Sequence, residues 1–295
     1  MKNFKNKIIL AGLFLSATFS LTAQDQDQDQ DADDGGSVIQ NLTPSKLIGQ
    51  GQWDIKLFNN LYTQDDSTFE FDQGIRQNFF TSTLEVFTGV SQNKRVNIGA
   101  IVEYRANGRD FEQADGSFER RTTSGLTSFA PAIKFVPFKN VGNFSILSAF
   151  SIPLISSEND EDTGVFLDQK GFTWQNRFFY DYTFPGKKWQ LFTELNSELN
   201  FGDEEESFAN NSLRLTPGVF LSYFPSSKFT ILGLVQHSEL LDLGNDFSQN
   251  FTTVGGGLKY QLTKELNIEG LYTNFVSGRD TGLGETFNIG LRAVF

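Results

Sequence analysis

Charged side chains recur at every second position in several segments of this chain. In 188–201, Glu194 and Glu198 share one parity, whereas Leu191 and Leu195 share the other. Successive side chains of a β-strand point to opposite faces, so this alternation is typical of a strand with one polar and one apolar face. The spacing therefore predicts that the charged groups act together on one surface of a sheet.

Assigned by the same parity, seven basic and seven acidic side chains lie on the polar face. The basic ones are Lys56, Arg105, Lys134, Arg177, Arg214, Lys259 and Arg292. The acidic ones are Asp54, Glu85, Glu103, Asp181, Glu194, Glu198 and Glu269. In the core of a soluble sandwich each of them would need a buried partner. A closed barrel with a polar lumen and an apolar outer surface in lipid removes that cost.

The two signs are equal in number on this face, which bears on selectivity. A strongly selective ion pore needs one sign to dominate its narrowest ring. The balance predicts either cross-strand ion pairs or a mixed polar path. For Arg214 and Arg292 we expect acidic neighbours such as Glu194 or Glu198, and we expect both to tolerate replacement by Leu.

Catalytic chemistry has little support in the sequence. The single histidine, His237, precedes Ser238, and neighbours on a strand point to opposite faces, so the two cannot pair as base and nucleophile. Glu239 shares the face of His237, which alone does not make a site. Cysteine is absent, and no phosphate-binding loop, dinucleotide motif or metal-ligand cluster is present. We predict neither enzymatic activity nor a cofactor or metal, and the net charge of −12 disfavours nucleic acid.

From residue 49 onward the chain divides into strand-length segments. Its 32 Phe and 27 Gly residues favour an all-β chain. We predict twelve strands, and residues 67–72 alternate in a way that could lengthen a neighbouring one. The segments are 51–63, 79–91, 95–106, 122–137, 143–155, 171–184, 188–201, 212–224, 228–239, 249–262, 265–276 and 284–295.

The gaps between these segments alternate between short and long. Three short gaps begin with Pro and carry Lys, as in 185–187, and Pro presets the backbone of a tight turn. The long gaps are acidic, as in 159–162 and 203–206. Short turns on one side and long loops on the other are typical of an antiparallel transmembrane β-barrel, with periplasmic turns and extracellular loops. A soluble sandwich with long loops is the alternative.

Two further features bear on the surroundings. Aromatic residues stand at segment ends, among them Tyr62, Phe79, Trp189 and Tyr223, and predict two girdles at the membrane interfaces. The acidic loops are expected either to bind lipopolysaccharide phosphates through divalent cations, to attract cationic solutes, or simply to be solvated.

The amino-terminal part reads as targeting and linker sequence. Residues 1–23 combine three lysines with an apolar run and a small Ala23, which predicts a signal peptide. Residues 24–48 open with an acidic repeat and are expected to form a disordered linker. Three aspartates in it have calcium-loop spacing, but Asp34 and Gln40 stand where such a loop needs Gly and Glu. The barrel itself is predicted to span 49–295.

The last segment, 284–295, alternates strictly and ends on Phe295. It resembles the final strand of bacterial outer-membrane β-barrels, whose terminal aromatic residue is an assembly signal. The resemblance implies residence in the outer membrane, contact with its lipid and lipopolysaccharide, and recognition by the barrel assembly machinery.

A narrower resemblance rests on the acidic Asp/Gln leader, the Phe- and Asn-rich strands and the final GLRAVF. These are similar to barrels of the Bacteroidota and, more distantly, to the transporter-like barrels grouped with meta-pathway phenol degradation. The resemblance implies passive passage of small solutes, apolar ones among them. Two hypotheses follow: a channel or transporter for small molecules, and a structural or adhesive barrel whose acidic loops bind a partner.

Overall fold

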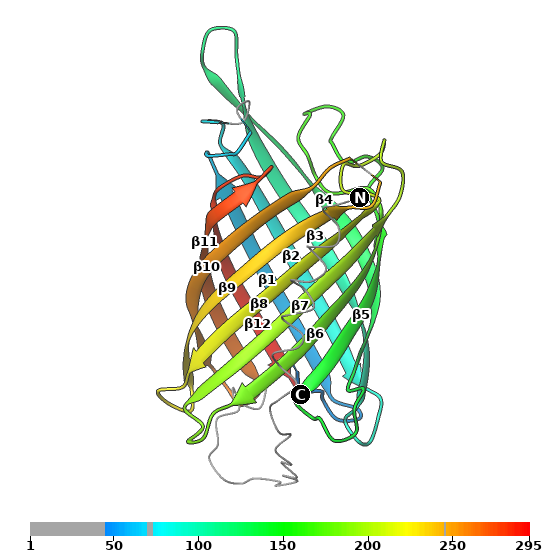
Figure 1. The fold of residues 1–295 in the computed structure, drawn as a ribbon, viewed down its shortest axis with the longest axis vertical. Coiled ribbons are helices and arrows are strands. Elements are labelled where there is room, and N and C mark those ends of the chain that lie inside the picture. Colours follow the sequence, from blue (N-terminus) through cyan, green and yellow to red (C-terminus); the bar gives the residue numbers. More distant parts are fainter. Residues whose placement is uncertain (1–44, 70–72, 245) are drawn as a thin grey trace, which may run out of the picture.

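The protein forms one closed antiparallel barrel of twelve strands, each paired with its neighbours along the chain (Figure 1). The computed structural model describes residues 45–69, 73–244 and 246–295. Within these residues no helix is long and apolar enough to cross a membrane. The strands are β1 (Trp53–Gln64), β2 (Gln77–Gly89), β3 (Val96–Glu112), β4 (Phe118–Phe135), β5 (Phe144–Pro153), β6 (Phe172–Thr183), β7 (Trp189–Phe201), β8 (Ser212–Tyr223), β9 (Phe229–Asp242), β10 (Gln249–Gln261), β11 (Leu266–Arg279) and β12 (Glu285–Val294).

The first and last strands close the barrel. Register runs from Asp54 opposite Val294 to Thr63 opposite Glu285. Beyond it, the backbone amides of Trp53 and Phe295 each donate to the other residue's carbonyl, at 2.7 and 3.0 Å. Closure leaves no unpaired sheet edge. A β-sheet in hydrocarbon requires this, because the lipid cannot hydrogen-bond to free backbone groups.

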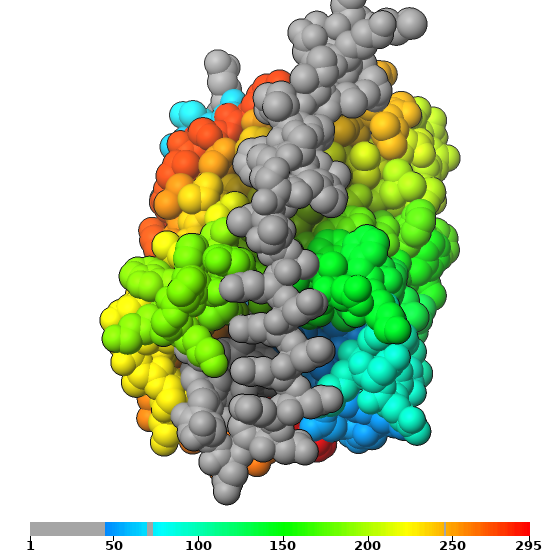
Figure 2. Space-filling view, turned by 60° about the horizontal axis from the view of Figure 1, so that its bottom comes forward, coloured from blue at the N-terminus to red at the C-terminus, as the bar shows by residue number. Residues whose placement is uncertain are grey.

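The predicted fold class and all twelve predicted strands are confirmed. The short turns gather at one end, called here the periplasmic end, and the long loops at the other, extracellular end (Figure 1). Figure 2 turns this view so that the periplasmic end comes forward. The predicted signal peptide (1–23) and most of the predicted linker (24–48) lie outside the described residues.

One predicted loop is wrong. Residues 107–121 were expected to be irregular, but β3 and β4 continue through most of them, down to Glu112 opposite Phe118. The resulting hairpin projects beyond the barrel (Figure 1). Its charged side chains pair across the two strands, as Arg120 does with Asp110 at 2.8 Å, so the polar composition that predicted a loop instead supports a solvated ribbon.

An ion pair between distant strands identifies the inner face. Arg177 on β6 contacts Glu85 on β2, although three strands separate them along the wall. Only side chains that project into the lumen can meet in this way. The charged parity therefore faces inward, and the apolar parity, including Leu57, Ile289 and Leu291, is exposed on the outside.

The structure resolves one ambiguous strand and corrects one expectation. In β9, where apolar residues occupy both parities, the register places Leu232 and Leu234 inside and leaves Ile231 and Val235 exposed outside. Tyr62 and Phe79 were expected in the interfacial girdles, but they lie on the inner parity, where their rings stack with centroids 5.8 Å apart. Position at a strand end alone does not determine which face an aromatic ring takes.

A short segment before β1 packs inside the periplasmic end. Ser45 and Ile48 are buried, and the backbone of Gly49 approaches Gly89 so closely that a Cβ there would lie 1.9 Å from the Gly49 carbonyl oxygen. The Lys46 carbonyl accepts a hydrogen bond from Lys134 Nζ at 3.3 Å. Residues 45–48, assigned by sequence to the linker, thus belong to the barrel's packing.

The face assignment predicts opposite effects of one substitution at two sites. Leu291 lies outside between Leu57 and Ile268, so Leu291→Arg should place a charge in the hydrocarbon and cost about 2–4 kcal/mol near the midplane. Gln236→Arg, on the inner face, should be tolerated. Heat-modifiable gel mobility after refolding into vesicles measures both. Normal folding of Leu291→Arg together with failure of Gln236→Arg would invert the faces.

Candidate functional site

Four ionic side chains form a continuous bridge across the lumen. Lys56 Nζ lies 2.9 Å from Glu85 Oε2, Glu85 Oε1 lies 3.5 Å from Arg177 Nη1, and Arg177 Nε lies 2.7 Å from Glu194 Oε1. These residues belong to β1, β2, β6 and β7. Because β1 and β7 are separated by five strands on either side, the bridge joins opposite walls of the barrel.

Small and aromatic side chains make room for this bridge. Between β2 and β6 the inner face carries Ala130, Ala132 and Ala149, which project little into the lumen. The Arg177 guanidinium also lies over the Phe179 ring, 5.1 Å from its centroid, a favourable cation–π arrangement. Arg177 is thereby held across the lumen rather than along its own wall.

A second ionic cluster lies nearer the extracellular end. Arg105 pairs with Glu103 at 2.7 Å and with Asp168 of the β5–β6 loop at 2.8 Å. The same loop is held by Asn107, whose Nδ2 donates to the carbonyls of Phe166 and Leu167, both at 2.9 Å. Burial raises the pKa of the Asp168 carboxyl above its ordinary range, although Arg105 acts in the opposite direction.

Two further pairs of candidate charges join neighbouring strands. Arg214 lies 3.7 Å from Glu198, and Lys259 lies 2.7 Å from Glu269. The partner expected for Arg214 among Glu194 and Glu198 is therefore present. Lys134 and Asp181 are buried on the inner face towards the periplasmic end, and Lys134 Nζ lies 5.4 Å from the centroid of the Phe179 ring.

Arg292 has a different partner from the one expected. Its Nε and Nη2 donate to the two oxygens of Asp54 at 2.8 and 2.7 Å, in the bidentate geometry that makes such pairs strong. Both side chains are buried, at 12% and 9% exposure. The pair joins β12 to β1, where the barrel closes. Because the two residues are 238 positions apart, the sequence does not show that they meet.

The lumen also contains an apolar surface that the parity analysis missed. This inner apolar arc consists of Phe87, Ile101, Ala130, Ala132, Leu147, Ala149, Phe179, Phe192 and Phe220. Three of its rings follow one another on β6, β7 and β8, with centroids 6.0 and 5.2 Å apart. The available signal was a Phe on the polar parity of three consecutive segments, each about the same distance from the short turn.

His237 and Ser238 lie on opposite faces, as expected. His237 is on the outer parity, with Nδ1 2.9 Å from Thr252 Oγ1, whereas Ser238 is buried inside beside Arg214. Across 45–69, 73–244 and 246–295, no three His, Asp or Glu side chains are grouped so as to hold a metal ion.

The Arg292–Asp54 contact predicts that the two charges depend on each other. Arg292→Leu should leave a buried carboxylate unpaired and destabilise the barrel by about 3–5 kcal/mol, against our sequence expectation of tolerance. The double variant Asp54→Leu/Arg292→Leu should recover most of that loss. Urea unfolding in lipid vesicles measures both, and equal stability of Arg292→Leu and the unaltered chain would contradict the pairing.

The raised pKa of Asp168 predicts a pH effect on the loop. Protonation of Asp168 stabilises the folded loop, and this contribution is lost as the pH rises through the raised pKa. On acidification Asp168 is neutralised at a higher pH than exposed aspartates, and its contact with Arg105 loses one of its two charges while the loop stays folded. Asp168→Asn should therefore show at neutral pH the rate of proteolytic cleavage in the β5–β6 loop that the unaltered protein shows at acid pH.

Asp115 provides the control for that experiment. It is exposed at the hairpin tip, and hydrogen bonds from Ser117 lower its pKa. Asp115→Asn should leave the pH profile of cleavage in the β5–β6 loop unchanged. An identical profile for Asp168→Asn and the unaltered protein would show that this carboxyl does not control the loop.

Comparison with solved structures places the fold among outer-membrane barrels. An outer membrane channel from Pseudomonas putida F1 matches with a TM-score of 0.64 at 8% identity, covering 85% of this chain and 98% of that one. The β domain of the Bordetella autotransporter BrkA matches with a TM-score of 0.56 at 14% identity, covering 82% and 99%. No protein-family model and no curated protein sequence matches. The chain therefore has the fold of Gram-negative outer-membrane β-barrels, in agreement with the predicted location in the outer membrane.

Proposed function

We propose that this protein is an outer-membrane channel for the passive passage of small solutes, controlled by the bridge Lys56–Glu85–Arg177–Glu194. The bridge itself carries the proposal. Its Lys56 and Arg177 side chains remain 30% and 28% exposed, so the centre of the barrel is a hydrated, charged space. A barrel that served only as a scaffold would gain more from a packed apolar interior.

The arrangement also suggests how passage is controlled. Each charge in the bridge has a partner of opposite sign, so neither cations nor anions meet a ring of one sign. A solute has to pass beside the bridge or separate its weakest contact, the 3.5 Å link between Glu85 and Arg177. Membership of the Bacteroidota-type or meta-pathway-like transporter barrels remains part of this proposal, and so does assembly through Phe295 by the barrel assembly machinery.

The second candidate is a structural or adhesive barrel that binds a partner through its extracellular loops. It is favoured by a cleft of about 410 Å³ between the β5–β6 and β7–β8 loops. Its lining includes Glu158, Asp160, Glu161, Glu205 and Glu206, with Lys170 paired to Glu206 at 2.7 Å. Lipopolysaccharide is the partner proposed for this alternative. Silence in planar bilayers at all voltages would favour it over the channel.

Planar-bilayer conductance of an Arg177 variant tests the channel. Arg177→Gln removes the link between the two walls and leaves Glu194 without its cation. We expect a larger conductance and a reversal potential shifted towards cation selectivity. The matched control is Arg214→Gln, since Arg214 pairs with Glu198 on the neighbouring strand β7. An Arg177→Gln conductance no larger than that of Arg214→Gln would refute control by the bridge.

A further inference from the structure

The wall of the barrel is interrupted between β4 and β5. Phe129 lies opposite Ile152 and Ala132 lies opposite Ala149, but no pairing joins Ala130 and Pro131 to β5. Proline has no amide hydrogen to donate, and within sheets it is otherwise confined to edges and bulges. In a closed barrel there is no edge, so Pro131 creates a gap in the ladder inside the wall, as Pro217 does between β8 and β9.

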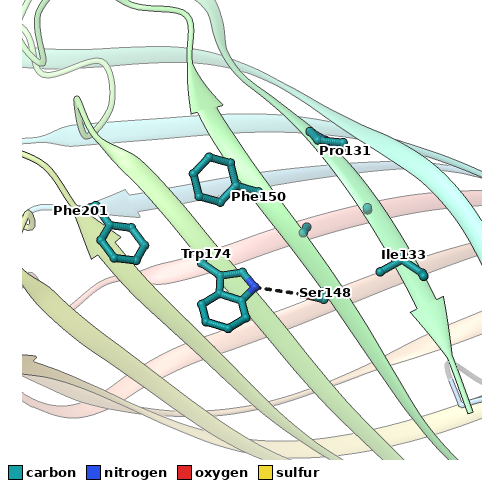
Figure 3. A pocket seen from close by; sticks show the side chains of 8 residues that line it. Pro131, Ile133, Ser148, Phe150, Trp174 and Phe201 are labelled. Carbon is teal, nitrogen blue, oxygen red and sulfur yellow. Dashed lines mark hydrogen bonds between the residues drawn. The ribbon is translucent and has the colours of Figure 1, made fainter. Parts of the chain in front are cut away.

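An apolar groove lies over this gap on the outer surface. It has a volume of about 390 Å³ and is lined by outward-facing Pro131, Ile133, Phe150, Trp174 and Phe201 (Figure 3). The indole Nε1 of Trp174 donates to Ser148 Oγ at 3.0 Å, so the polar group of that ring is already satisfied. What remains for a ligand is an aromatic surface. An engineered apolar cavity in another protein holds benzene in ~150 Å³.

The groove and the inner apolar arc share two residues. Ala132 and Ala149 line the groove from the lumen side, and both belong to the arc with Leu147 and Phe179. Apart from glycine, alanine has the smallest side chain. The groove on the lipid-facing wall and the arc in the lumen therefore lie back to back at this pair of alanines, beside the interrupted ladder.

The interrupted ladder between β4 and β5, together with the groove over it, is called here the seam. We propose that the seam is a binding site and side opening through which a small apolar solute passes between the lumen and the bilayer. The inference deepens the proposed channel function and rests on it. Irregular backbone at membrane depth is tolerated where it lines a water-filled cavity, and the lumen of the proposed channel provides one. An apolar solute gains by leaving a charged lumen for hydrocarbon, whereas an ion does not, so the seam separates solutes by polarity.

A disulfide across the seam tests the opening. Ala132 and Ala149 are direct cross-strand partners, and the chain has no other cysteine to compete. In the double variant Ala132→Cys/Ala149→Cys, oxidation should tie the strands together and narrow the route. The control, Asn60→Cys/Asn288→Cys, joins another directly opposed inner pair, on β1 and β12. Heat-modifiable mobility confirms that each variant is folded.

The readout is uptake of N-phenyl-1-naphthylamine, an apolar dye that fluoresces on entering a bilayer, by intact Gram-negative cells that express each variant. Expression of the unaltered protein should speed uptake. Oxidation of the seam pair should return it to the rate of cells lacking the protein, and reduction should restore it, while the control pair has no effect. Uptake that is unaffected by the seam disulfide, or not raised by the unaltered protein, would overturn the proposal. Ion conductance of the same variants is measured in parallel, so loss of the channel function is recognised separately.

Discussion

Every backbone amide in the wall must find its partner on a neighbouring strand, because hydrocarbon offers none. This constraint accounts for the closed ladder from β1 to β12 and for the backbone contacts between Trp53 and Phe295 that complete it. It also gives Pro131 its importance. One residue without an amide hydrogen is a minor defect at a soluble sheet edge, but inside a closed wall it opens a gap that neighbouring side chains have to accommodate.

The lumen is subject to a related constraint. Charges there are only partly hydrated, so a partner of opposite sign stabilises them strongly where the structure supplies one. Neighbouring strands supply most of these partners, as for Lys259 and Glu269. Arg177 differs because it has partners on both sides, one on the adjacent β7 and one across the lumen on β2. That double engagement turns a wall contact into a bridge.

The bridge and the inner apolar arc share the wall from β2 to β7. The alanines of β4 and β5 serve both, since they leave space for Arg177 inside and form the floor of the groove outside. One lumen therefore presents two different surfaces. In the proposed channel, ions and polar solutes would encounter the bridge, whereas apolar solutes would encounter Phe179, Phe192 and the β4–β5 seam beyond them.

The sequence alone determined what depends on local periodicity. The alternation in 284–295 distinguished the apolar from the polar face, because the side chains of a strand alternate whatever the strand packs against. The parity of Arg177, Glu85 and Arg292 was readable for the same reason. The lengths of the gaps indicated the strand count and the topology. The extension of the hairpin strands into 107–121 could not be predicted, because a solvated ribbon and a loop have the same polar composition.

Tertiary structure decided which inward groups meet. Arg177 and Glu85 are 92 positions apart, and Arg292 and Asp54 are 238 apart. Their contacts depend on barrel closure and on the stagger of strands around the wall, neither of which leaves a local pattern in the sequence. The groove at Pro131 arose in the same way: the proline was visible in the sequence, but the residues that line the gap came together only when four strands were placed side by side.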